Sequence, residues 1–169
     1  PIKIEQKNYQ FVYIGRLVFY KNIEVILHAW NIVIKKFPDA KLVIAGDGPN
    51  KESLQELVNK LDMTQNIIFM GYVTVEQKSK LLAESNALLF PSTMEGFGLV
   101  MLESFQQNRP VITSNIPPMS DIIENNKTGF LINPNDEKEW AEKIISIIKD
   151  PKISNKMGSE GNKVLKEKY

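Results

Sequence analysis

The sequence alternates between short apolar runs and longer segments in which apolar residues recur every three or four positions. Short apolar runs are typical of strands buried on both faces, and the three-to-four spacing is typical of amphipathic helices. Because parallel neighbouring strands need crossover connections, the alternation predicts an α/β fold, a doubly wound parallel six-stranded sheet with helices on both faces. The expected strands are Phe11–Ile14, Lys41–Ala45, Ile67–Phe69, Ala87–Phe90, Val111–Thr113 and Phe130–Ile132.

The boundaries of the helical segments also carry local signals. Asn22 precedes the first helical stripe and is expected to cap that helix, while Thr74 and Gln77 match a capping box. A short helix is expected at residues 120–124, and a weakly patterned helix is expected after Pro151. Residues 1–10 show no pattern and are interpreted as a linker remnant, so residues 11–169 are predicted to form one domain.

Composition narrows the possible functions. The 169 residues carry a formal net charge of +1, no cysteine and one histidine. A charge near zero gives no reason to expect a nucleic-acid partner, and this composition excludes disulfides, thiolate metal sites and the usual zinc sites. No apolar run approaches membrane-spanning length, so we expect a cytoplasmic protein. The lysine-rich end is expected to be a solvated face, with peripheral contact of the full-length protein with the inner face of the cell membrane as the alternative.

The most constrained stretch is Ala87–Phe105. Its apolar run ends at Pro91, which has no N–H to donate to a strand ladder, and Gly96–Gly98 then allows a tight turn before a helical pattern. A helix that begins at such a turn presents unpaired N–H groups and the positive end of a dipole, which suit a phosphate. Glu95 lies just before these glycines, and Glu103 lies within the helix that follows.

Two cations follow the first expected strand. Arg16 comes directly after Gly15, and Lys21 lies five residues later, before the next helix. The carboxyl ends of parallel strands form one edge of the sheet, so both cations can reach the edge that carries the Gly96–Gly98 turn. A diphosphate there would meet a guanidinium fork, a point charge and a helix N-terminus, which could replace a metal ion.

The two glutamates are expected to contact other parts of such a ligand. Glu103 could accept two hydrogen bonds from a ribose cis-diol, and Glu95 lies where a sugar attached to the diphosphate would project. A solvated helix or loop acid is the structural alternative for each. Gly46–Gly48 begins a dinucleotide fingerprint, but Lys51 stands where its third glycine should be. We therefore do not expect an NAD site.

Five motifs in this order resemble the C-terminal half of a retaining family-4 (group 1) glycosyltransferase of GT-B fold. The likeness extends from Phe11 to about Lys149, and its two glutamates match the Glu-x7-Glu motif of that family. The motifs are Gly15-Arg16 with Lys21, Ala45–Pro49, Phe69–Val73, Pro91-Ser92, and Glu95–Gly98 with Glu103.

The resemblance implies a Rossmann-like domain that binds a nucleoside-diphosphate sugar and transfers its sugar to an acceptor with retention, without a metal ion or other cofactor. Arg16 and Lys21 would hold the diphosphate, Glu103 would hold the ribose, and Glu95 would contact the donor sugar. Arg16, Lys21 and Glu95 would thus be the catalytic residues. Backbone at residues 96–99 (Gly96, Phe97, Gly98 and Leu99) would meet the sugar and the distal phosphate, and backbone near Tyr72 and Val73 would line the nucleobase.

The resemblance also implies an N-terminal acceptor domain that is absent from this chain, so the isolated domain is expected to turn over little or nothing. The chain departs from the family at Pro117-Pro118, where a Gly-Gly loop is common, at Asp121, which replaces glutamate, and at Asn22, which replaces glycine. Prolines donate no backbone hydrogen bond. Two alternatives therefore stay open: a non-catalytic nucleotide-sugar sensor or interaction module of the same fold, or half of a GT-B epimerase or phosphorylase.

Overall fold

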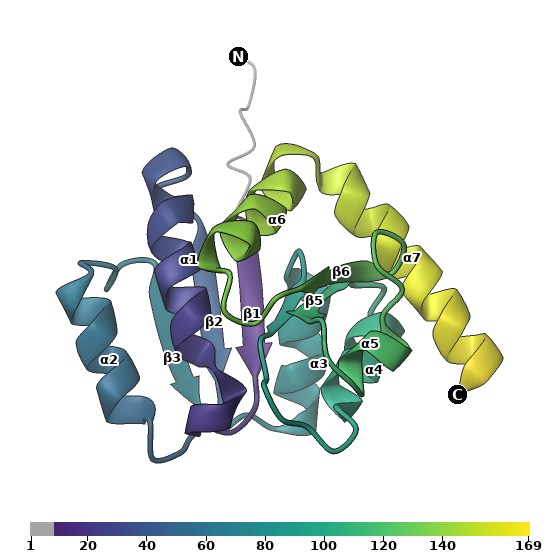
Figure 1. Ribbon diagram of the computed structural model, residues 1–169, viewed down its shortest axis with the longest axis horizontal. Coiled ribbons are helices and arrows are strands. Elements are labelled where there is room, and N and C mark those ends of the chain that lie inside the picture. The colour runs from purple at the N-terminus through teal and green to yellow at the C-terminus, as the bar shows by residue number, and fades with distance from the viewer. Residues whose placement is uncertain (1–8) are drawn as a thin grey trace.

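The computed structural model describes residues 9–169, and its centre is a single parallel sheet (Figure 1). The six strands lie in the order β3-β2-β1-β4-β5-β6, and every neighbouring pair is parallel. This arrangement confirms the predicted fold. The strands are β1 (Gln10–Ile14), β2 (Lys41–Ala45), β3 (Ile67–Gly71), β4 (Leu88–Phe90), β5 (Val111–Ser114) and β6 (Gly129–Ile132).

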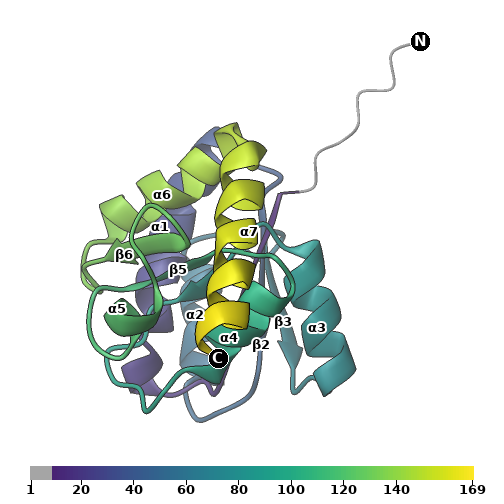
Figure 2. The same ribbon diagram turned by 90° about the vertical axis from the view of Figure 1, so that its right-hand side faces the viewer.

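Helices cover both faces of this sheet. One apolar cluster joins one face to α1, α2 and α6, and a second joins the other face to α3, α4 and α5. Figure 1 shows α1, α2 and α6 in front of the strands, and Figure 2 shows α7 beside α4. The helices are α1 (Ile23–Lys36), α2 (Lys51–Lys60), α3 (Val75–Glu84), α4 (Leu99–Gln106), α5 (Met119–Ile122), α6 (Glu137–Lys149) and α7 (Pro151–Lys168), with a 3-10 turn η1 (Phe19–Lys21) before α1.

The alternation of side chains along β1 explains why two layers of helices form. Phe11 and Tyr13 point into the cluster with α1 and α6, whereas Val12 and Ile14 point into the cluster with α4. All four side chains are buried, as expected for a strand at the centre of a parallel sheet. The sequence order of the strands reverses at β1, which lies between β2 and β4. In folds of this type, ligands bind beyond the carboxyl ends of the strands at such a reversal.

The expected boundary of the domain is wrong by at least one residue. Gln10, assigned to a linker remnant, begins β1 and pairs with Lys41 of β2. Tyr9 also contributes to the folded body, because its ring contacts Phe37 and its carbonyl accepts a hydrogen bond from the amide of Lys41. The rest of the expected linker, residues 1–8, lies outside the described residues. The short helix expected at residues 120–124 occupies Met119–Ile122.

The expected side-chain cap at Asn22 is not formed. Asn22 occupies the position before α1 with left-handed backbone angles (φ 55°), yet its side chain makes no hydrogen bond to that helix. Its amide instead donates to the carbonyl of Pro91 over 3.3 Å and to that of Pro134 over 2.8 Å. Asn22 therefore ties the loop after β1 to the loops after β4 and β6. The capping box of Thr74 and Gln77 at the start of α3 is confirmed.

Candidate functional site

The carboxyl edge of the sheet contains a hollow of about 310 Å³ beside the end of β1. Its floor is the backbone after β1 and β2, where Gly46 packs so closely on Gly15 that a Cβ at position 46 would overlap the carbonyl oxygen of Gly15. A side chain at this position would therefore force the two loops apart. The lining residues are Ile14, Gly15, Arg16, Ala45, Gly46, Asp47, Tyr72, Val73, Val75 and Lys78.

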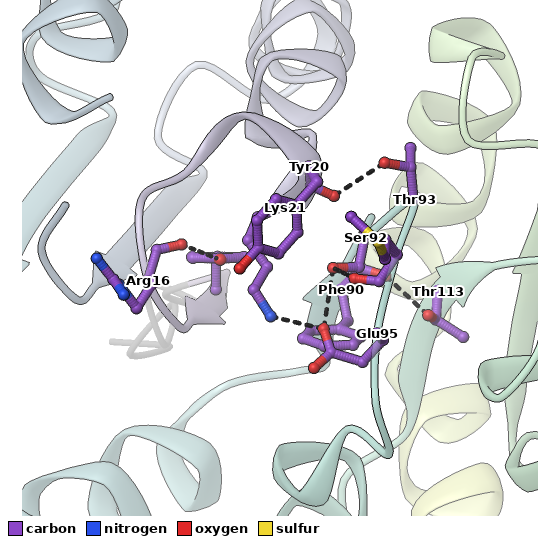
Figure 3. A network of polar contacts seen from close by, with 10 residues as sticks. Arg16, Tyr20, Lys21, Phe90, Ser92, Thr93, Glu95 and Thr113 are labelled. Atoms are coloured by element: carbon purple, nitrogen blue, oxygen red, sulfur yellow. Dashed lines mark hydrogen bonds and ion pairs between the residues drawn. The ribbon is translucent and has the colours of Figure 1, made fainter. Parts of the chain in front are cut away.

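Arg16 and Lys21 lie at this edge but face different groups. Arg16 lines the hollow, together with Tyr72 and Val73, and its guanidinium points away from Lys21 in Figure 3. Lys21 instead donates to Glu95 Oε2 over 2.5 Å, across the boundary between η1 and the loop after β4. The structure therefore does not bring the two expected phosphate ligands into contact with each other.

The Lys21–Glu95 ion pair is largely shielded from water, with the two side chains 12% and 16% exposed. The hydroxyl of Ser92 also donates to Glu95 Oε2, over 3.1 Å, and the Lys21 ammonium lies 5.4 Å from the centre of the Phe90 ring (Figure 3). Both groups of the pair are therefore well stabilised, because the ammonium lies over an aromatic face and the carboxylate accepts hydrogen bonds from two donors. Glu95 is thus the ion-pair partner of Lys21.

The buried ring of Tyr13 lies behind this pair. Burial raises the pKa of its phenol far above the usual range, and the negative charge of Glu95 raises that pKa further. The neutral hydroxyl donates to the backbone carbonyl of Arg16 over 2.8 Å and so holds the loop after β1 against the sheet. Tyr13 is therefore a structural support of the residues that line the hollow.

The glycine turn after β4 leaves a row of backbone amides without acceptors. Within residues 9–169, no protein group accepts a hydrogen bond from the amides of Gly96–Val100. Gly98 directly precedes α4 with left-handed backbone angles (φ 77°), which explains the glycine at this position. Together with the positive end of the α4 dipole, these amides suit an anionic group. The side chains of Phe97 and Leu99 are exposed.

Glu103 of α4 pairs with a lysine that the sequence did not indicate. Lys78 Nζ lies 2.9 Å from each carboxylate oxygen of Glu103, and its geometry forms a hydrogen bond with Oε1 alone. Oε2 is buried and accepts no hydrogen bond in the described part of the chain. Because Lys78 also lines the hollow beside Arg16, it connects that hollow to the second glutamate.

Comparison with known proteins shows to which family this chain belongs. Residues 1–164 match the family described as Glycosyl transferases group 1. The chain belongs to this family. It is 30% identical over 167 residues to the capsular polysaccharide biosynthesis glycosyltransferase CapM of Staphylococcus aureus, a match that covers 99% of this chain and 44% of CapM. The chain thus spans less than half the length of this curated relative.

Two solved structures share the fold of this chain. A TarM variant from S. aureus, solved in complex with fondaparinux, α-GlcNAc-glycerol and UDP, superposes with a TM-score of 0.91 at 28% identity, over 96% of this chain and 33% of TarM. The C-terminal domain of LpcC from Francisella tularensis superposes with a TM-score of 0.84 at 26% identity, over 95% of this chain and 86% of that domain. The recognised GT-B relationship and the Rossmann-like fold are therefore confirmed.

Two further observations concern the expectations for metals and membranes. Among residues 9–169, no group of three or more His, Cys, Asp or Glu side chains is placed to hold a metal ion. In the same part of the chain, no helix combines the length and the apolarity needed to cross a membrane.

The family departure at Pro117-Pro118 lies between β5 and α5, where both ring nitrogens lack a hydrogen to donate.

Proposed function

We propose that this chain is the donor-binding domain of a retaining glycosyltransferase. It binds a nucleoside-diphosphate sugar, and the complete enzyme transfers the sugar to a glycan, a lipid or another glycoconjugate. The observation that carries the proposal is the juxtaposition, at one edge of the sheet, of the Arg16-lined hollow, the open amides of Gly96–Val100 and two ion-paired glutamates. Membership of the group 1 family supports the same reading.

The roles of the individual residues follow from what each can offer. Arg16 presents a guanidinium to the hollow, and the amides before α4 present N–H groups, so a diphosphate that bridges them receives charged and neutral donors. Glu103 accepts ribose hydroxyls, and Glu95 accepts hydroxyls of the donor sugar. The apolar side chain of Val73 and the exposed ring of Tyr72 contact the nucleobase.

The proposed chemistry is retaining and needs no metal ion. As the bond between the anomeric carbon and the diphosphate breaks, negative charge builds up on the leaving phosphate. Arg16, Lys21 and the amide row stabilise that charge more strongly in the transition state than in the bound donor. Lys21 becomes available when sugar hydroxyls take its place beside Glu95. A hydroxyl oxygen of the acceptor then bonds to the anomeric carbon on the face that the diphosphate leaves, and the proton of that hydroxyl passes to the departing phosphate.

The acceptor site is proposed to lie on another domain. CapM and TarM are each more than twice as long as this chain, since the aligned region covers 44% of CapM and 33% of TarM. A second domain that faces the carboxyl edge of the sheet would place the acceptor next to Glu95. We therefore expect the 169-residue chain to bind donor without efficient turnover.

Calorimetric titration tests this function. We expect the chain to bind at least one of uridine, guanosine and adenosine diphosphate in the presence of a chelator, with the same affinity when Mg²⁺ is added. UDP is the first candidate, because the TarM complex contains it. Arg16→Ala and Glu103→Ala should each weaken binding about tenfold or more.

Two exposed residues away from this edge provide matched controls. Lys152 of α7 and Glu142 of α6 carry the same charges as the tested pair, and Lys152→Ala and Glu142→Ala should leave binding unchanged. Absence of binding by all three nucleotides, or equal binding by the wild type and all four variants, would contradict the proposal.

A non-catalytic sensor is the second candidate, and Pro117-Pro118 is the observation that favours it. Two prolines remove two backbone donors from the loop after β5. A sensor would bind the nucleotide sugar through the same edge, yet a full-length protein with both domains would leave the donor intact. Sugar release or transfer by the full-length protein, lost on Glu95→Gln, would favour the enzyme.

A further inference from the structure

Lys78 occupies a position that the proposed binding residues leave unexplained. It lies in the first part of α3 (Val75–Glu84), lines the hollow that Arg16 also lines, and contacts both carboxylate oxygens of Glu103 in α4. Glu103 itself does not line that hollow. Lys78 is therefore a side chain that lines the hollow and also contacts this glutamate.

The helix dipole alone would not favour a lysine here. The N-terminal end of a helix carries partial positive charge, so a cation near it is disfavoured. Glu103 offsets this cost, because its carboxylate lies 2.9 Å from the ammonium and both side chains are only partly exposed, 25% for Lys78 and 34% for Glu103. Partial burial makes such a pair more strongly coupled than an ion pair on an open surface.

The carboxylate of Glu103 keeps most of its capacity for hydrogen bonds. A carboxylate can accept about four hydrogen bonds, and Lys78 supplies one, to Oε1. Oε2 is buried without a donor, which costs free energy unless a nearby charge or a ligand hydroxyl compensates. Lys78 thus fixes the orientation of a carboxylate that can accept further hydrogen bonds.

We propose that Lys78 is a positioning residue of the donor site, which holds the Glu103 carboxylate ready to accept the hydroxyls of the donor ribose. This inference rests on the proposed function. A carboxylate held in one orientation loses less rotamer entropy when a cis-diol binds, and it discriminates more sharply between ribose and deoxyribose. Without Lys78, Glu103 would be free to rotate and its recognition of the ribose would weaken.

The test compares the binding of UDP with that of 2′-deoxy-UDP in the 169-residue chain. The wild type should bind UDP about tenfold more tightly, since one hydrogen bond to a charged acceptor is lost with the deoxy analogue. Lys78→Gln should bring the ratio of the two dissociation constants close to one, whereas Lys78→Arg should restore most of the preference. A purely structural role for Lys78 would change both affinities and leave their ratio unaltered.

Lys80 provides the matched control on the same helix. It is 75% exposed and lies 3.9 Å from Glu84, so Lys80→Gln removes a lysine from α3 without touching Glu103. This variant should keep the wild-type ratio, and thermal unfolding should show Lys78→Gln folded. If the chain binds guanosine or adenosine diphosphate instead of UDP, that nucleotide and its 2′-deoxy analogue serve for the same comparison. A wild-type chain that binds none of the three would overturn the proposed function and this inference with it. A wild type that discriminates, with Lys78→Gln discriminating equally, would overturn the inference alone.

Discussion

At the scale of single residues, two internal ion pairs dominate the candidate site. Lys21 pairs with Glu95, and Lys78 pairs with Glu103. Each pair joins a cation that could bind phosphate or ribose to a glutamate with a different expected role. A phosphate that binds Lys21 must replace Glu95, so the affinity for a free diphosphate depends on how firmly Glu95 holds Lys21. The Lys78–Glu103 pair is proposed to persist when the ligand binds.

Glu95→Gln should consequently strengthen the binding of a nucleoside diphosphate that carries no sugar. The amide keeps the size of the side chain but loses the negative charge that occupies Lys21 and repels a phosphate. We expect the dissociation constant of UDP to fall by about tenfold in calorimetry, on the scale of one charged contact. Glu24→Gln, an exposed change in the first turn of α1, is the control for loss of charge. Unchanged or weaker binding by the Glu95 variant would show that Lys21 does not meet the phosphate.

Because of Tyr13, the stability of the fold should depend on pH in the alkaline range. Burial raises the pKa of its phenol above the ordinary value of about 10, so the unfolded chain releases this proton at a lower pH than the folded chain. The stability that the buried, neutral phenol contributes is fully present below about pH 10 and is lost as the pH rises above it.

Tyr13→Phe should therefore lower stability near neutral pH by about 1 kcal/mol, through the lost hydrogen bond to the Arg16 carbonyl. Above about pH 10, its free energy of unfolding should fall less steeply than that of the wild type. Urea unfolding between pH 8 and pH 11 measures both effects. Tyr72→Phe, at a side chain that is 87% exposed, should follow the wild type, and parallel curves for all three proteins would refute the assignment.

Sequence reasoning located the residues of the site better than it located their partners. Glu95, Glu103, Arg16 and Lys21 are all at the predicted edge, because the ends of parallel strands and the glycine turn fix their places. The direction in which each side chain points depends on rotamers and neighbours that no spacing rule specifies. Lys78 was missed for this reason, although a lysine near the start of a helix was a usable signal, as it was for Lys21.

At the scale of secondary structure, α7 is the element that the sequence described least well. Its apolar pattern is interrupted by Gly158 and Gly161, two poor helix formers, yet the helix continues from Pro151 to Lys168. The structure explains both glycines by close packing on α4. A Cβ at position 158 would overlap the carbonyl oxygen of Asn108, and one at position 161 would meet the ring of Phe105.

Gly158→Ala should thus destabilise the protein even though alanine favours helices. The methyl group would push α7 away from the end of α4, at an expected cost of about 2 kcal/mol. Ser159→Ala, at the neighbouring exposed position, should be neutral or slightly stabilising. Chemical denaturation of the two variants measures the difference. Equal or greater stability of Gly158→Ala would mean that α7 does not need this close approach.

The packing of α7 also supports the proposed site. It lies against α4, whose first two residues, Leu99 and Val100, belong to the row of open amides. The ring of Tyr169 contacts that of Phe97 with 6.2 Å between the ring centres. The glycine turn is therefore held from both sides, by η1 through the Lys21–Glu95 pair and by the end of α7. Sequence patterns gave the strands and most helices because burial sets their periods, whereas helix–helix approach depends on contacts between distant residues.

At the scale of the whole molecule, the six strands, their crossovers and their parallel order were predictable because few topologies satisfy such an alternation. The glycosyltransferase family was predictable only through motifs that lie at one edge of that sheet. The proposal that needs testing first is that protein cations and backbone amides at the carboxyl edge of β1 and β4, without a metal ion, bind the diphosphate of a nucleotide sugar.

The most direct measurement is an amide NMR titration of the isotope-labelled chain with UDP in the presence of a chelator. We expect the largest chemical-shift changes at the amides of Gly96–Val100, with further changes around Gly15 and Arg16 and at Glu103. Arg16→Ala should reduce all of them at the same UDP concentration. Changes centred elsewhere, such as the separate hollow between β6 and α7 that Phe130 and Met157 line, or no changes without Mg²⁺, would contradict the proposal.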